Sequence, residues 1–204
     1  MNVRSENLSL EEGKILVKTA RTVIEEYVKY GRIPPKPQVP ESLKQPRGVF
    51  VTLEKRGELR GCIGYPFPSM PLIDALVDAA ISSATRDPRF EPVGPEELDE
   101  IEIEVSVLSK PEEIRVKHPR EYLEKIEIGR DGLIVQYGGY SGLLLPQVPV
   151  EWGWDVEEFL CQTCMKAGLP PDYWLKKDVK IMKFTAQIFR ERSPGGEVEE
   201  RRLI

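Results

Sequence analysis

The feature that most constrains the fold is an alternation of apolar and polar residues that runs through segment 101–108 and is broken only by its last residue, Leu108. This segment reads Ile-Glu-Ile-Glu-Val-Ser-Val-Leu. Successive side chains of a β-strand point to opposite faces, so the pattern predicts a strand with one buried and one acidic face. Because a lone strand is not stable in water, the chain must build a sheet and cover one side of it.

Further patterns predict the partners of this strand. Segments 49–54 and 59–64 flank a turn, as do 133–137 and 142–145, which is typical of antiparallel hairpins. Helices are expected in 9–31, 69–86 and 155–168, where apolar residues recur at helical spacing behind capping signals. We therefore predict an α+β fold, mainly an antiparallel sheet with flanking helices.

The predicted domain spans residues 1–190 and has unequal parts. A composition shift near residue 110 predicts a larger lobe of 1–110 and a smaller lobe of 111–150, with the helix and strand of 155–190 packing back on the larger lobe. Residues 191–204 are charged and lack apolar periodicity, so we expect a mobile tail.

The charge and the cysteine content indicate which partners and which cellular compartment to expect. The chain has 29 Lys and Arg against 34 Asp and Glu, a net charge of -5, so we expect neither nucleic acid nor a membrane as partner. No apolar run is long enough to cross a bilayer. Three cysteines suit a reducing compartment, and we expect a cytoplasmic protein.

Several short motifs follow one another in the order that is typical of a known protein family. They include Leu-Arg-Gly-Cys-Ile-Gly at 59–64, Asp-Pro-Arg-Phe at 87–90 and Gly-Leu-Leu-Leu-Pro-Gln-Val at 142–148. From about Lys14 to Arg190 the chain resembles the AMMECR domain family. The resemblance implies two lobes with a cleft between them and an association with Memo-like and radical SAM proteins. It implies no substrate, cofactor or catalytic residue, so the cofactor stays unknown.

Cys62 is the candidate nucleophile of the sequence. On a strand Arg60 and Cys62 share a face, where the guanidinium would favour the thiolate. The alternative is that Cys62 is a small buried apolar residue. The only histidine, His118, lies in a loop-like stretch outside the motifs, so Asp87, Glu102 or Glu104 would have to act as base.

Ligand-binding candidates surround this cysteine in the sequence. Gly61 and Gly64 would let a ligand approach the backbone, or would serve only tight packing. Arg86, Asp87 and Arg89 could clamp a carboxylate or phosphate, or form a capping ion-pair cluster. With Arg60 and Glu104 these residues form the predicted ligand-binding set, and we expect Arg60, Cys62 and Arg89 to line one concavity.

Two other groups are interpreted as packing residues. Cys161 and Cys164 have the spacing of a redox or metal motif, but no second pair completes a metal site, so no metal is predicted. Trp152, Trp154 and Trp174 are interpreted as core or lobe-interface anchors.

Two hypotheses about function follow. The chain is an enzyme or small-molecule binder that uses the thiol and the arginines, or it is an interaction module without catalysis. In the second case the cleft or the extended proline segment 34–40 would receive a partner protein, and an exposed apolar patch beside that segment would favour it.

Overall fold

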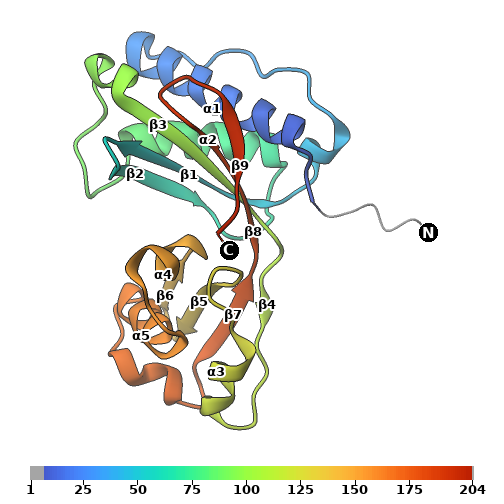
Figure 1. Ribbon diagram of the computed structural model, residues 1–204, viewed down its shortest axis with the longest axis vertical. Coiled ribbons are helices and arrows are strands. Elements are labelled where there is room, and N and C mark those ends of the chain that lie inside the picture. Colours follow the sequence, from blue (N-terminus) through green and yellow to red (C-terminus); the bar gives the residue numbers. More distant parts are fainter. Residues whose placement is uncertain (1–6, 204) are drawn as a thin grey trace. The chain divides into compact units, whose positions relative to one another are not determined.

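The computed structural model describes residues 7–203 and divides the chain into two compact units (Figure 1). The first contains the chain up to Leu108 together with Gln187–Arg202, and the second contains Ser109–Ala186. Each unit has its own antiparallel sheet with helices against it. The predicted α+β class is therefore confirmed.

The first unit is built on a five-stranded sheet of order β2-β1-β3-β8-β9. Its strands are β1 (Gly48–Lys55), β2 (Glu58–Tyr65), β3 (Ile101–Leu108), β8 (Ala186–Glu191) and β9 (Val198–Arg201). Its helices are α1 (Leu10–Tyr30) and α2 (Leu72–Thr85), with short 3-10 turns η1 (Glu41–Lys44) and η2 (Pro95–Glu100).

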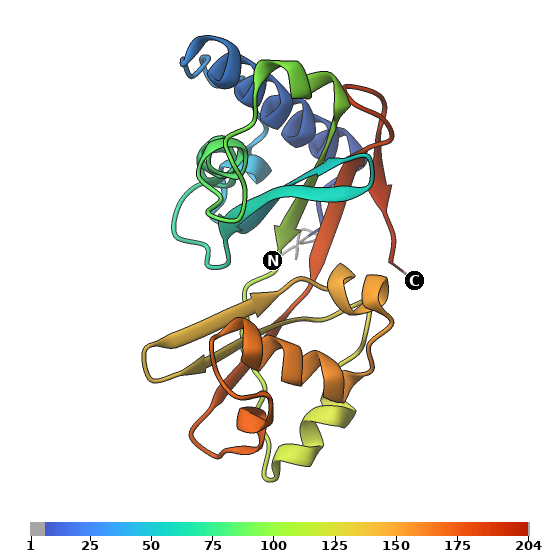
Figure 2. The ribbon, with the colours of Figure 1, turned by 90° about the vertical axis from the view of Figure 1, so that its left-hand side faces the viewer.

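Helices α1 and α2 cover the same face of this sheet (Figures 1 and 2). A capping box between Ser9 and Glu12 starts α1, and Gly31, at φ 66°, ends it. The apolar residues of the alternating segment 101–108 are buried in the same core as Leu16 and Leu76 from the two helices. As the alternating pattern predicted, the apolar side chains of β3 lie on the face of the sheet that the helices cover. Glu102, Glu104 and Ser106 lie on the opposite face.

An ion pair inside this unit ties α1 to the end of β8. Arg21 Nε donates to Glu191 Oε1 at 3.0 Å, and its Nη1 donates to the carbonyl of Leu98 at 3.0 Å. Glu191 also accepts the backbone N–H of Ile103 at 3.0 Å. Both charged side chains are buried, so these bonds offset the cost of removing the charges from water.

The second unit has a four-stranded sheet of order β4-β7-β5-β6. Its strands are β4 (Glu112–Glu113), β5 (Gly132–Tyr137), β6 (Tyr140–Leu144) and β7 (Lys180–Phe184). Its helical elements are η3 (Pro119–Glu121), α3 (Tyr122–Lys125), α4 (Gln147–Trp152), α5 (Val156–Lys166) and η4 (Pro171–Leu175). Phe159, Leu160 and Cys164 of α5 pack against Leu133 and Val135 of β5.

The structure corrects the expected organisation after residue 150. Helix α5 belongs to the second unit, and its apolar stripe is buried in the core of that unit. The single strand expected near 181–190 is two strands, β7 and β8, which lie in different sheets. Thr185, between them, exchanges hydrogen bonds of 2.9 Å with Ser109.

The expectation of a mobile tail is also wrong. Residues 198–201 form β9, paired antiparallel with β8, and Val198 is buried in the first core. Because an edge strand is held by backbone hydrogen bonds and cross-strand ion pairs, it does not need the apolar periodicity that the prediction required. One such pair joins Arg190 to Glu199, with Nε 3.0 Å from Oε1.

Within residues 7–203, none of the helices combines the length and the apolar character that a passage through a lipid bilayer demands.

Candidate functional site

A polar row crosses the first sheet on the face opposite α1 and α2. Thr52 is the register partner of both Cys62 on β2 and Glu104 on β3. Residues directly opposite each other in antiparallel strands point to the same face, so the three side chains stand side by side. Thr52 Oγ1 donates to Cys62 Sγ at 3.3 Å. We call Cys62, Thr52 and Glu104 the polar row.

Arg201 extends the polar row from the other edge of the sheet. It lies on β9, two strands beyond β3, and its Nη1 donates to Glu104 Oε2 at 2.9 Å. The Glu104 side chain is buried, whereas that of Arg201 is 21% exposed. The buried carboxylate of Glu104 is thus paired with a cation, which offsets the cost of removing its charge from water.

Asp87 and Arg89 form a rigid clamp at the Cys62 end. Arg89 binds both oxygens of Asp87, with Nε–Oδ1 of 2.9 Å and Nη2–Oδ2 of 2.7 Å. Asp87 also accepts the backbone N–H of Cys62 at 2.9 Å, and Arg89 Nη2 lies 3.3 Å from the Cys62 carbonyl oxygen. The Asp87 side chain is only 2% exposed, while that of Arg89 is 42% exposed. The guanidinium is therefore held in one orientation with its outer edge in contact with solvent.

The charge state of the clamp is well defined. Burial acts to raise the pKa of Asp87, but the hydrogen bonds from Arg89 and from the Cys62 backbone lower this pKa to about 2. The same hydrogen bond to Asp87 raises the pKa of Arg89. Both groups are charged at neutral pH, so the clamp is a fixed ion pair.

The thiol of Cys62 is not activated by its surroundings. Burial raises the pKa of Cys62, and this effect outweighs the Thr52 hydrogen bond and the Arg89 charge, which both lower it. Asp87 and Glu104 raise this pKa further. Because the thiolate is the nucleophile, a neutral thiol near pH 7 is a hydrogen-bonding group and a poor attacking group.

A β-bulge at Arg60 interrupts the alternation that predicted this residue on the same face as Cys62. The register shifts between Leu53 and Glu54, which leaves Arg60 as the extra residue of β2. Its guanidinium binds Glu97 with distances of 3.1 and 2.8 Å, and hydrogen bonds led by that of Arg60 lower the pKa of Glu97 to about 2. Both arginines lie near the ring of Phe90. The ring centre is 6.0 Å from Cζ of Arg60 and 5.4 Å from Cζ of Arg89.

The two glycines of the motif pack against the protein itself. A Cβ on Gly61 would lie 2.1 Å from the carbonyl oxygen of Ser83 in α2. A Cβ on Gly64 would lie 2.1 Å from the carbonyl oxygen of Val49. Both positions therefore admit close backbone contact, which was the alternative interpretation of these glycines.

Arg86 stands outside the clamp. Its side chain is 59% exposed, and its Nη1 lies 3.8 Å from Asp78 Oδ1, so the two residues form a weak ion pair on the surface. His118 is exposed in the second unit. Of the residues predicted from sequence, the structure thus joins Cys62, Asp87, Arg89 and Glu104. Arg60 binds Glu97 and lies near the Phe90 ring, and Arg86 pairs with Asp78.

Thr52, Phe90 and Arg201 contribute to this site and were absent from the prediction. The alternation in 49–54 places Thr52 on the polar face, and this signal could have identified it. Arg201 carries no such signal, because its position follows from the pairing of β9 with β8.

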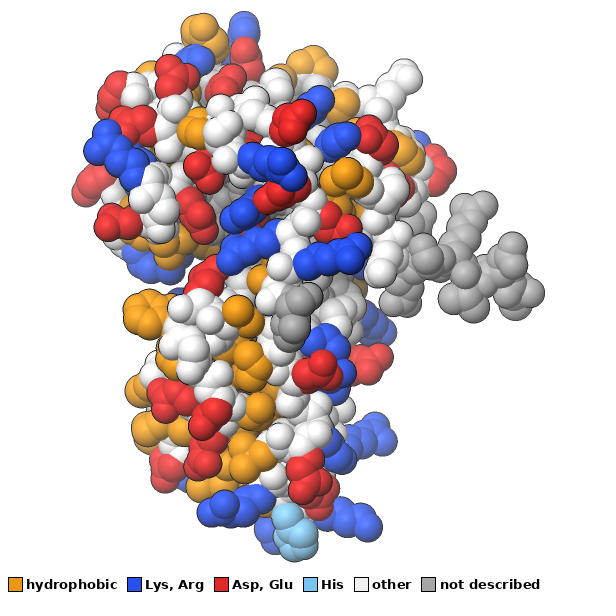
Figure 3. Space-filling view, in the orientation of Figure 1, with side chains coloured by type: hydrophobic (Ala, Val, Ile, Leu, Met, Phe, Trp, Pro, Cys, Tyr) orange, Lys and Arg blue, Asp and Glu red, His pale blue; other side chains and the backbone are white. Residues whose placement is uncertain are grey.

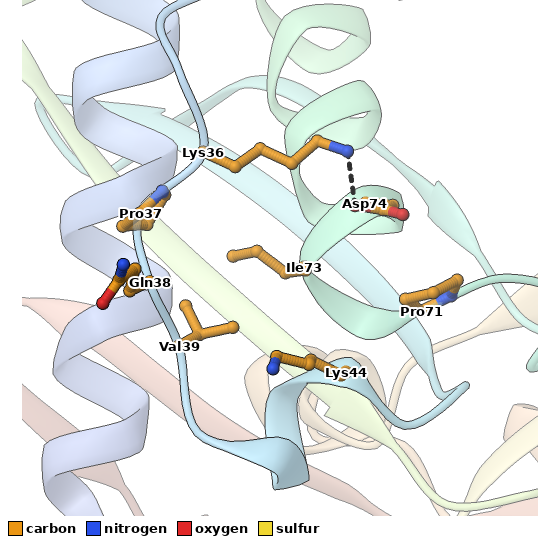
Figure 4. A pocket seen from close by; sticks show the side chains of 8 residues that line it. All are labelled: Lys36, Pro37, Gln38, Val39, Lys44, Pro71, Ile73 and Asp74. Atoms are coloured by element: carbon orange, nitrogen blue, oxygen red, sulfur yellow. Dashed lines mark hydrogen bonds and ion pairs between the residues drawn. The ribbon is translucent and has the colours of Figure 1, made fainter.

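A second feature of the first unit is a hollow of about 580 Å³ beside the extended proline segment (Figure 4). Its lining includes Val39 from that segment and Ile73 from α2, with the Lys36 side chain running across to Asp74. Lys36 Nζ lies 2.6 Å from Asp74 Oδ1. None of the predicted site residues lines this hollow.

The cysteine pair of α5 is part of the second core. Cys164 is fully buried, and burial raises its pKa to about 11. Burial also raises the pKa of Cys161. In the part of the chain that the structure describes, no three His, Cys, Asp or Glu residues are arranged to hold a metal ion.

Of the three tryptophans, Trp152 is not a core residue. Trp174 is buried in the second core and Trp154 packs partly against it. Trp152 is 71% exposed. It ends α4 next to Gly153, whose φ of 66° turns the chain outward.

The fold places this chain among α+β proteins that are built from two units, each with its own antiparallel sheet. The AMMECR1 family profile matches residues 17–189, and the chain belongs to this family. Protein MJ0810 of Methanocaldococcus jannaschii is 60% identical over 97% of this chain and 98% of its own length. A protein of Methanothermobacter thermautotrophicus is 59% identical over 90% of this chain and 96% of its own. The crystal structure of protein PH0010 from Pyrococcus horikoshii superposes with a TM-score of 0.92 at 55% identity, covering 94% of this chain and 97% of that one.

Proposed function

We propose that the chain binds a small organic anion at the polar row, with Arg89 as the primary contact. The ligand class is a carboxylate or phosphate monoester that also carries a hydroxyl or amine group. The observation that carries this proposal is the Asp87–Arg89 clamp, which fixes a guanidinium with 42% of its side chain exposed. A cation that is already oriented loses little entropy when it binds an anion.

The polar row supplies the second half of the recognition. Thr52 and the neutral Cys62 thiol offer weakly polar hydrogen-bonding groups, and Glu104 offers a carboxylate beside them. Strands two apart in a sheet are separated by roughly 10 Å, so the row matches a molecule of metabolite size. A ligand hydroxyl or amine would meet Glu104 while its anionic group meets Arg89.

Binding fits the geometry better than nucleophilic catalysis by Cys62. A catalytic thiol requires a lowered pKa, whereas burial raises the pKa of this one. The association with Memo-like and radical SAM proteins rests on the family resemblance alone, and it would make the ligand an intermediate of a shared modification pathway.

The test compares two arginines three residues apart. The purified protein, Arg89→Gln and Arg86→Gln are screened by thermal shift against a panel of small carboxylates and phosphate monoesters. We expect at least one compound to stabilise the wild type and Arg86→Gln but not Arg89→Gln. Arg89→Lys, which keeps the charge but loses the two-point contact with Asp87 that orients the side chain, should bind more weakly than the wild type.

Two outcomes would overturn the binding proposal. One is that no compound in the panel stabilises the wild-type protein, and the same protein purified from its native cells carries no small molecule in native mass spectrometry. The other is equal stabilisation of all the arginine variants by each active compound. A folded Arg89→Lys variant keeps the comparison valid if Arg89→Gln does not fold.

A second candidate is an interaction module, and the surface beside the proline segment favours it. Tyr30 is 65% exposed and Ile33 is 57% exposed, directly before residues 34–40. The hollow lined by Val39 and Ile73 lies beside the same segment. Exposed apolar side chains next to a concave surface are typical of sites that receive a partner.

Photo-crosslinking in native cells tests this candidate. A photoreactive residue is placed at Ile33 and, as a control, at the exposed Glu124 of the second unit. A discrete adduct from the first position alone would support the module. Identical adduct patterns from both positions would refute it.

A further inference from the structure

Trp152 and Trp154 form an exposed aromatic surface on the second unit. Their ring centres are 6.0 Å apart with an interplanar angle of 20°, so the rings are stacked. Trp154 is partly buried against the second core. Trp152 stacks on Trp154, and 71% of its area is exposed. The inner ring is thus anchored, and the outer ring presents its indole to solvent.

The backbone holds this pair in place. The N–H groups of Gly153 and Trp154 donate to the carbonyls of Val150 and Pro149 at 3.3 and 2.9 Å, which closes the end of α4. Asp155 then caps α5, accepting the N–H of Glu158 at 2.8 Å. Because both flanking helices end at the pair, an exposed indole is a built feature and not the end of a loose loop.

The sequence on both sides of the aromatic pair is acidic. From Asp131 to Met165 the chain contains no Lys, Arg or His, and its acidic residues are Asp131, Glu151, Asp155, Glu157 and Glu158. The last four flank the tryptophans in sequence and are exposed. Figure 3 shows acidic and hydrophobic side chains together over the region where Figure 1 draws α4 and α5.

We propose that this acidic aromatic surface, defined by Trp152, Trp154 and their four flanking acidic residues, docks an arginine-containing segment of a partner protein. The charge of the surface selects a cationic partner, and an exposed indole face binds a cation through its ring electrons. Arginine suits the site better than lysine, because its planar guanidinium stacks on an indole while its N–H groups reach carboxylates beside the ring. The surface lies on the second unit, so this inference goes beyond the proposed function of the first.

The test uses a short fluorescent peptide of alternating glycine and arginine, titrated with the full chain while anisotropy is measured. Matched peptides replace every arginine by lysine or by glutamate. We expect the arginine peptide to bind most tightly, the lysine peptide to bind several-fold more weakly, and the glutamate peptide not to bind. Raised salt should weaken the binding.

Variants locate the site. Trp152→Ala should weaken binding of the arginine peptide about fivefold or more, as expected for loss of a cation–π contact with its apolar area. Phe67→Ala, which removes an exposed aromatic side chain of the first unit, should leave the binding unchanged. Glu157→Lys should weaken it, and Glu124→Lys, the same charge change outside the surface, should weaken it less.

Other results would overturn the inference. These are no binding of the arginine peptide to the wild type at low salt, equal binding of the arginine and glutamate peptides, or unchanged binding by a folded Trp152→Ala variant. Trp152→Phe keeps an aromatic ring and should retain part of the affinity. Full affinity in a Trp152→Leu variant, which keeps apolar area without an aromatic ring, would also overturn the inference.

Discussion

Asp87 accepts the backbone N–H of Cys62 at 2.9 Å, and this single bond ties the end of α2 to the middle of β2. The aspartate is also bound by Arg89 through both carboxylate oxygens. One buried carboxylate therefore sets the position of the proposed anion contact and of the thiol. The following predictions test what this arrangement and its neighbours contribute.

Asp87→Asn should destabilise the protein near neutral pH by about 2 kcal/mol, the equivalent of the lowered pKa. A carboxyl whose pKa is depressed on folding contributes stability above its unfolded pKa and loses it as pH falls through the folded value. The wild type should thus lose this contribution between about pH 4 and pH 2, and the variant should show a flatter pH dependence there. Urea unfolding at a series of pH values measures both.

Asp99→Asn is the control for this experiment, because Asp99 is exposed. Some slope should remain in Asp87→Asn, since the pKa of Glu97 is also lowered to about 2. A variant whose stability follows the wild-type pH curve without change would show that Asp87 carries no such linkage.

Cys62 should react slowly with iodoacetamide near neutral pH in the folded protein. Burial raises its pKa, so little thiolate is present, and the rate should rise steadily as pH increases. The urea-unfolded chain serves as the reference and should be labelled faster, because unfolding exposes the thiol and removes the burial that raises its pKa. Rapid labelling of the folded protein at Cys62 would restore the nucleophile hypothesis.

Gly61→Ala should destabilise the first unit by about 1–3 kcal/mol, because its Cβ would meet a backbone oxygen of α2 that cannot move away alone. Gly139→Ala is the matched control, since a Cβ there meets no atom within 4 Å. Guanidinium unfolding compares the two. Equal effects at both positions would contradict the packing role assigned to Gly61.

Ending the chain after Arg192 should destabilise the protein by about 1.5–3 kcal/mol from the loss of the buried Val198 alone. The same truncation removes the hydrogen bond from Arg201 to Glu104. A chain that ends after Arg201 retains β9 and should keep wild-type stability. If both truncations unfold at the wild-type denaturant concentration, β9 does not contribute to folding in solution.

Much of the local structure could be predicted from sequence, because it rests on local patterns. The alternation in 101–108 gives a strand, and Ser9 with Glu12 gives a helix start. Both signals act between residues that are close along the chain, where backbone geometry alone decides which side chains meet.

The candidate site could be predicted only in part. Cys62, Asp87, Arg89 and Glu104 belong to a larger predicted set, and these four lie together in the structure. Arg60 was placed beside Cys62 by strict alternation, and the bulge at Leu53 and Glu54 breaks that alternation. A bulge depends on the pairing of two strands, so one strand's pattern does not reveal it.

By itself, the sequence determined the α+β class, the alternating strand with its polar face, and the presence of a thiol, arginines and carboxylates in one set of motifs. The tertiary structure alone decided which charges are paired, that the thiol is neutral, that Arg201 reaches Glu104, and that Trp152 is exposed. The physical reason is that secondary structure follows from short-range periodicity, whereas burial and pairing depend on segments far apart in the chain that only folding brings into contact.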